Sequence, residues 1–177
     1  MKVFALAWLL AAGNVWFASG AEVKRFELNA EETLTIAVPQ AIRAQFGPAE
    51  GGQPAHLILS DTNRVCEMHM VLGRNAAKLS DDQLKSQLLE AGKQLLSAVV
   101  EKEIRIQELK GSAFTYFDFE LTDNRPDPLQ GSRYVLKGKG QGSGYICEFV
   151  MLTNRKGGDA KDQILNSLRS LGIRAKK

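Results

Sequence analysis

Residues 80–100 are SDDQLKSQLLEAGKQLLSAVV, the strongest helix signal in the chain, and the architecture follows from it. Ser80 and Gln83 match a capping box, and the two aspartates between them place negative charge at the positive end of the helix dipole. Apolar residues recur at helical spacing on one side, at Leu84, Leu88, Leu95 and Val99, widened by Leu89, Leu96 and Val100. The pattern predicts an amphipathic helix that runs to about Glu101 and lies across a sheet.

Segments on both sides of this helix alternate apolar and polar residues, as strands do. Residues 104–109 and 113–121 form a predicted hairpin around Gly111, and Phe117 and Phe119 lie on its apolar face. Residues 40–46 have weak helical character and lead into a loop rich in glycine and proline. The other predicted strands form three further hairpins: residues 23–28 with 32–38, 56–60 with 64–72, and 133–137 with 145–152.

A second amphipathic helix is predicted near the C-terminus. Asp159 can cap this helix and Gly172 can end it. Its buried stripe comprises Ile164, Leu165, Leu168 and Leu171. Two helices and about eight strands joined by short turns predict an α+β fold, a mainly antiparallel sheet with the two amphipathic helices packed on it.

Residues 1–20 have the pattern of a secretory signal peptide. Lys2 precedes an apolar run over residues 3–12, and small residues precede a predicted cut before Ala21. The run is about half of the roughly 20 residues that span a bilayer, so no transmembrane span is expected in the mature chain. We therefore expect a single α+β domain over residues 21–177, periplasmic or secreted, in a Gram-negative bacterium.

Composition limits the function classes. The chain has 177 residues, 44% of them hydrophobic, and a net charge of +3. This hydrophobic content is too high for a disordered protein, and the charge excess is too small to predict nucleic-acid binding. Partners have to be inferred from sites.

Cys66 and Cys147 are candidates for a disulfide, because an exported chain folds in an oxidising compartment. Alternation places each thiol on the inward face of its strand. A bridge between them would close a loop of about 80 residues and stabilise the fold by roughly 4 kcal/mol. The alternative is two unconnected buried cysteines.

Cys66, Met68 and Met70 are a weak candidate for a copper site, since soft sulfur ligands suit that metal. His69 points to the opposite face of the strand, so at most the three sulfur atoms converge. Methionines on an inward face are more often core filling than ligands. We therefore expect no cofactor and no metal.

Catalytic chemistry has little support. The two histidines, His56 and His69, lie in no recognised nucleophile and base motif. Asp118 and Glu120 share one strand face, which permits paired acid chemistry, but an exposed polar face of a sheet explains them more simply. A protein that is not an enzyme is expected.

Residues 137–144, KGKGQGSG, combine alternating glycines with two lysines. A strand follows them where a phosphate-binding loop would feed a helix, so they predict a flexible hairpin tip. The alternative is a partner-contact loop that presents positive charge to an acidic protein or a lipid headgroup. Its candidate residues are Arg133, Tyr134, Lys137 and Lys139.

The order of elements resembles the PsbP/Mog1-like fold family, including its small bacterial exported members. The supporting residues are Gly111 before the aromatic strand Phe114, Tyr116, Phe117 and Phe119, then Gly131, Ser132, Arg133 and Tyr134, and then residues 145–152. The resemblance implies an assembly or binding factor with no shared catalytic residue set.

These inferences predict a non-enzymatic exported protein that binds a macromolecular partner, most simply a protein of the cell envelope, through surface loops. A periplasmic immunity or inhibitor protein that blocks a toxin or hydrolase is the alternative, since it suits the export signal, the compact size and the lack of a catalytic motif.

Overall fold

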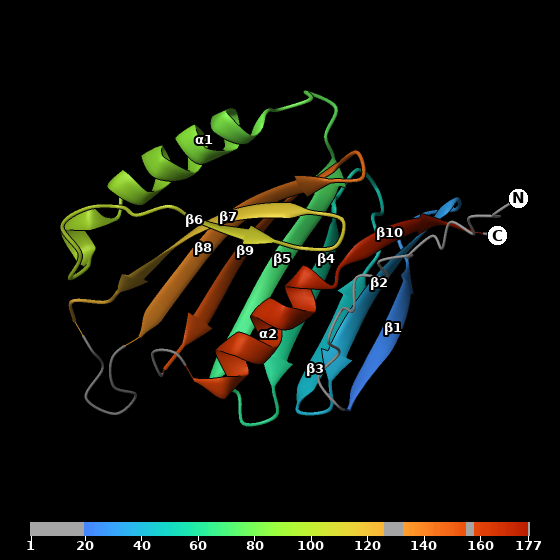
Figure 1. Cartoon of the computed structure of the whole chain (residues 1–177), viewed down its shortest axis with the longest axis horizontal. Helices are drawn as coiled ribbons and strands as arrows, with labels where there is room; N and C mark the ends of the chain where they lie inside the picture. Colours follow the sequence, from blue (N-terminus) through green and yellow to red (C-terminus); the bar gives the residue numbers. More distant parts are fainter. Residues whose placement is uncertain (1–19, 126–132, 155–157, 177) are drawn as a thin grey trace, which may run out of the picture.

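The computed structural model describes residues 20–125, 133–154 and 158–176 (Figure 1). The predicted signal peptide therefore lies almost wholly outside the described residues, as do Gly131 and Ser132 of the family resemblance. The described part is an α+β structure with two α-helices and ten strands in two antiparallel sheets. No helix in the described part of the chain has the length and apolar character needed to cross a membrane.

The larger sheet has seven strands and carries the main core. In spatial order they are β3 (Ile42–Gly47), β4 (Ala55–Asp61), β5 (Cys66–Arg74), β9 (Tyr145–Thr153), β8 (Tyr134–Gly142), β7 (Thr115–Thr122) and β6 (Gln107–Lys110). The smaller sheet has β2 (Glu32–Pro39) between β1 (Ala21–Glu27) and β10 (Gly172–Ala175). The hairpins predicted from alternation are thus confirmed, and β10 is a strand that the sequence pattern did not indicate.

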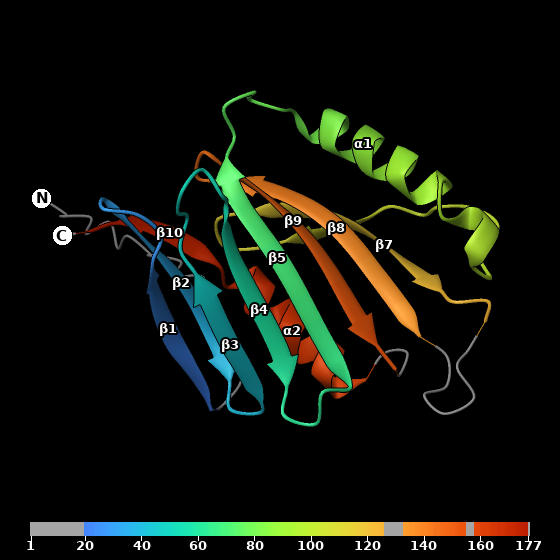
Figure 2. The same cartoon turned by 180° about the vertical axis from the view of Figure 1, so that it is seen from behind.

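Helices α1 (Asp81–Lys93) and α2 (Asp159–Arg169) pack on opposite faces of the large sheet (Figures 1 and 2). Ile164 and Leu168 of α2 are buried against the face that carries Tyr116 and Phe149. Leu84 and Leu88 of α1 are buried with Phe117, Phe119 and Leu121, which point to the other face. Each helix therefore closes its own apolar cluster.

The start of α1 is as predicted, but its end is not. Ser80 and Gln83 form both hydrogen bonds of the capping box. The helix ends at Lys93, and a short 3₁₀ turn (Leu96–Ala98) follows in place of further helix. Buried Gly92, a poor helix former, lies near this end, where a Cβ atom would meet the Ile104 side chain at 2.8 Å. As a result Leu95 and Val100, predicted in the buried stripe, are exposed.

Three other local predictions are wrong. Residues 40–46 contain most of β3, because Phe46 and its neighbours pair with β4. The α2 helix starts after Gly158 with no side-chain cap, and Asp159 is its first residue. The predicted hairpin tip at residues 137–144 is mostly strand: the turn is only Ser143 and Gly144, whose φ angles of 51° and 75° suit a two-residue hairpin.

The alternating glycines of β8 make room for aromatic rings. Gly138 pairs with Phe149, and a Cβ atom on it would lie 2.2 Å from that ring. Gly140 pairs with Tyr116, and its Cβ would lie 2.3 Å from the tyrosine ring. Both rings are buried in a closely packed core, so neither can move aside without a cost in free energy. The glycines are therefore packing positions and not signs of flexibility.

Alanine at either glycine is expected to destabilise the fold. We predict that Gly138→Ala and Gly140→Ala each lower the free energy of unfolding by about 1–3 kcal/mol, because the buried rings must shift. The matched control is Gly73→Ala in β5, where a Cβ atom would meet nothing within 4 Å and where less backbone freedom in the unfolded chain favours alanine. Urea unfolding measures all three. Equal effects at the three positions would contradict the packing role.

Candidate functional site

The face of the large sheet opposite α2 is only partly covered. Helix α1 contacts β7 and β8, and Figure 2 shows β4, β5 and β9 running across the rest with no helix over them. We call the uncovered side chains the open face. They are His56, Ile58, Glu67, His69, Val71, Val135, Lys137, Glu148, Val150 and Leu152.

Strand register brings these residues into adjacent rows. Ile58 pairs with His69, His69 with Val150, and Val150 with Lys137, so four strands contribute to one row. Leu152 and Val135 form the next row. Val71 is 42% exposed and Leu152 is 48% exposed. Such apolar side chains grouped on one sheet face are typical of a surface that binds another molecule.

The edge of the open face meets one side of α1. Lys139 makes an ion pair with Glu148 at 2.6 Å and donates a hydrogen bond to Gln87 of α1 at 3.0 Å. Gln141 donates to Asp81 at 2.6 Å. The polar side chains of β8 that point to the α1 face thus hold α1 in place and leave a groove beside it.

The four residues predicted as a partner-contact loop lie on or beside strand β8. Arg133 is exposed just before the strand, and Tyr134 points toward the α2 side. The Lys139 side chain is only 14% exposed and already paired. Lys137 lies in the open face, so it is the one member that joins the surface described above.

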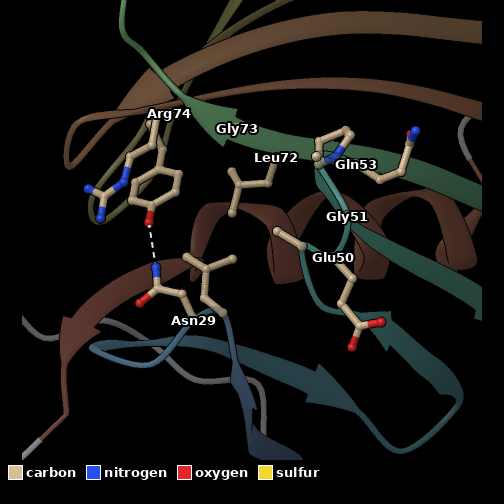
Figure 3. Close-up of a pocket in the computed structure, with 12 residues that line it drawn as sticks. Asn29, Glu50, Gly51, Gln53, Leu72, Gly73 and Arg74 are labelled. Atoms are coloured by element: carbon tan, nitrogen blue, oxygen red, sulfur yellow. Dashed lines mark hydrogen bonds between the residues drawn. The ribbon is translucent and has the colours of Figure 1, made fainter.

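A pocket of about 380 Å³ lies where the two sheets meet (Figure 3). Glu32 of β2 accepts hydrogen bonds from Tyr145 at 2.5 Å and from Asn29 at 2.8 Å. Arg74 donates to the same carboxylate at 2.5 Å and stacks 4.4 Å from the centre of the Tyr145 ring. Asn29 also donates a hydrogen bond to the Tyr145 hydroxyl at 3.1 Å, which is the dashed line from Asn29 in Figure 3.

These bonds change the acidity of both groups. The hydrogen bond from Tyr145, with those from Asn29 and Arg74, lowers the pKa of Glu32. Burial and the Glu32 carboxylate raise the pKa of Tyr145 to about 12. Because the polar groups bind one another, we interpret the network as the joint between β2 and the large sheet.

Asp118 and Glu120 differ from the exposed polar pair expected from the sequence. Asp118 is only 6% exposed, and burial raises its pKa to about 6. Glu120 pairs with Lys161 of α2 at 2.5 Å beside a hollow of about 580 Å³. Both carboxylates face α2, whereas His56 and His69 point to the opposite face, so the histidines cannot act with them. The ion pair between Glu120 and Lys161 attaches α2 to the sheet.

The predicted disulfide is not formed, and both cysteines are free and buried. Cys66 pairs with Thr153, whereas Cys147 pairs with Leu72, six residues along β5. Six strand residues span about 20 Å, far beyond the roughly 7 Å limit for bridged Cα atoms. Burial raises the pKa of Cys66 to about 11 and that of Cys147 to about 12, which keeps both thiols protonated.

The sulfur cluster proposed for copper is part of the main core. Cys66, Met68 and Met70 lie on the buried face of β5, and none is more than 2% exposed. His69 lies on the other face and bonds Glu67 at 2.5 Å. In the described ranges, no three His, Cys, Asp or Glu residues group as metal ligands. Core filling accounts for the sulfur atoms.

Comparison with known proteins identifies the fold alone. No protein-family model matches the chain, and no curated protein matches its sequence. The chain is similar to the solution structure of cyanobacterial PsbP from Synechocystis sp. PCC 6803, with a TM-score of 0.53 and 10% identity, covering 93% of this chain and 99% of that one. The similarity supports the PsbP-like fold that the element order indicated, and nothing finer.

The buried carboxylate of Asp118 predicts a pH dependence of stability. Its pKa is raised in the folded state, so the free energy of unfolding falls as pH rises from about 4 to about 6. Lys161 and Arg169 offset only part of the burial cost, and Glu120 adds to it. We predict that Asp118→Asn stabilises the protein by about 1–3 kcal/mol at pH 7 and has little effect near pH 3.5. Urea unfolding across this range would contradict the account if both proteins responded equally to pH.

Proposed function

We propose that this PsbP-like chain is an exported, non-enzymatic protein that binds a macromolecular partner in the cell envelope through its open face. One observation carries the proposal: Val71 and Leu152 expose apolar side chains on either side of the His69 and Val150 row, on a sheet face that no helix covers. Burying such side chains against a partner favours association through the hydrophobic effect, and the net affinity is what remains after the loss of translational, rotational and side-chain freedom.

The absence of a catalytic role is inferred from the arrangement of reactive groups. Burial keeps the two thiols protonated, Asp118 is buried, and Glu120 is held in an ion pair with Lys161. The polar groups at the junction pocket bind one another. The PsbP-like fold is compatible with a protein of this kind.

Export rests on the sequence pattern of residues 1–20, and the partner is therefore proposed in the periplasm or outside the cell. Strand β1 begins at Ala21, the residue that follows the predicted cut. The open face replaces the loops first expected to make the contact, because three of the four loop candidates lie outside it.

The open face predicts a specific loss of binding. Tagged full-length protein, recovered from periplasmic extract of the producing bacterium, should begin at Ala21 and retain a macromolecular partner. Leu152→Lys should reduce the retained partner by about tenfold or more, because it places a charge in the buried centre of the contact.

The matched control is Val23→Lys, which changes a residue 53% exposed in β1 of the smaller sheet. It should leave capture unchanged. Equal capture by wild type and Leu152→Lys would reject the open face as the binding surface, and a cytoplasmic chain beginning at Met1 would reject export.

A further inference from the structure

One side of α1 forms a wall next to the open face. A hollow of about 570 Å³ lies between this side of the helix and the sheet. Its helix residues are spaced by three or four positions and form one stripe: Gln83, Ser86, Gln87, Glu90 and Gln94. Lys139 forms part of its floor. Lys139 lies in one row with Glu148 and Val71, so the hollow adjoins the open face. We call this side of α1, rich in amide groups, together with the adjoining sheet surface the groove.

The sheet already shows how it holds a helix on this face. Leu84 and Leu88 of α1 pack on Phe117 and Phe119, while Lys139 bonds Gln87 from the flank. Apolar residues supply the contact area, and a long side chain of β8 fixes the position of the helix. The neighbouring part of the open face has the same combination of residues: apolar Val150 and Leu152, and the long side chain of Lys137 on β8.

One cation of this face has no partner. Glu148 pairs with Lys139, and Glu67 bonds His69, which is charged only when protonated. Lys137 has no carboxylate within ion-pair distance among the described residues. The face as a whole is not positive at neutral pH, but a carboxylate of a partner placed above Lys137 would pair with it.

The geometry favours a helix over a strand. β4, β5 and β9 are each hydrogen-bonded on both sides, so this surface offers side chains and no free backbone edge. A flat second sheet would collide with α1, which rises from the same face. The three strands span about 15 Å, enough for a helix about 10 Å across.

We infer that the groove beside α1 binds an amphipathic helix of a partner protein, with its apolar stripe on Val71, Val150 and Leu152 and an acidic residue paired with Lys137. The inference rests on the proposed function and specifies the kind of segment that the open face recognises. The bound partner helix lies next to α1 and becomes the second helix on this side of the sheet.

Site-specific photo-crosslinking tests this directly. Benzoylphenylalanine replaces Leu152 in the full chain in the producing bacterium, and a second variant carries it in place of Val100, which is 56% exposed at the end of the 3₁₀ turn. After irradiation, mass spectrometry identifies the segment joined to position 152. We expect a segment of another protein with apolar residues three and four positions apart and at least one acidic residue beside them.

A synthetic peptide of the crosslinked segment supplies the second measurement. It should gain helical circular dichroism on binding, and Lys137→Glu should weaken its Kd by about tenfold or more. Lys110→Glu is the control, because Lys110 lies on the edge strand β6, away from the groove. A crosslink from position 152 to an extended segment, to lipid or to a second copy of this chain overturns the helix inference, as does an equal effect of the two lysine variants. If position 152 gives no more crosslinked product than the Val100 control, the proposed function itself is overturned.

Discussion

The contact on which the rest of the structure depends is made by Tyr116, Gly140 and Leu168. The Tyr116 ring lies over Gly140, and its hydroxyl donates a 2.8 Å hydrogen bond to the Leu168 carbonyl near the end of α2. A side chain at position 140 would push the ring away from the sheet, and the bond to the helix would break. The absence of a Cβ atom in β8 thus sets how closely α2 sits on the large sheet.

The position of α2 determines what lies on either side of the sheet. The helix leads directly into β10, which pairs with β2 and brings the small sheet against the main core. The Glu32, Tyr145 and Arg74 network then joins the two sheets. One face of the large sheet is largely covered in this way, while α1 covers only β7 and β8 on the other. The open face is the consequence of this unequal cover.

Local sequence patterns predicted the hairpins and the start of α1, because alternation and capping depend on neighbouring residues. They could not predict strand register. Cys66 and Cys147 share a face, as alternation indicated, but the register of β5 and β9 separates them by six residues along the strands. Glycine composition suggested a loop at residues 137–144, since the aromatic rings that fill the space come from distant strands. The open face was missed for the same reason, because its residues come from four strands that only register brings together. Of the residues predicted from the sequence to contact a partner, Lys137 alone lies in the open face.

In the isolated protein, the α2 side of the large sheet is largely covered, and the part of the other face that α1 does not cover is exposed to solvent. Methyl NMR with a soluble gadolinium chelate measures this directly, since the chelate speeds relaxation only of methyl groups that solvent reaches. The account predicts strong effects at Val71 and Leu152, comparable to that at exposed Val23, and very weak effects at Leu59 and Met70 on the α2 side. Protection of Val71 and Leu152 to the level of Met70 would contradict it, because another part of the chain or a second copy would then cover the open face.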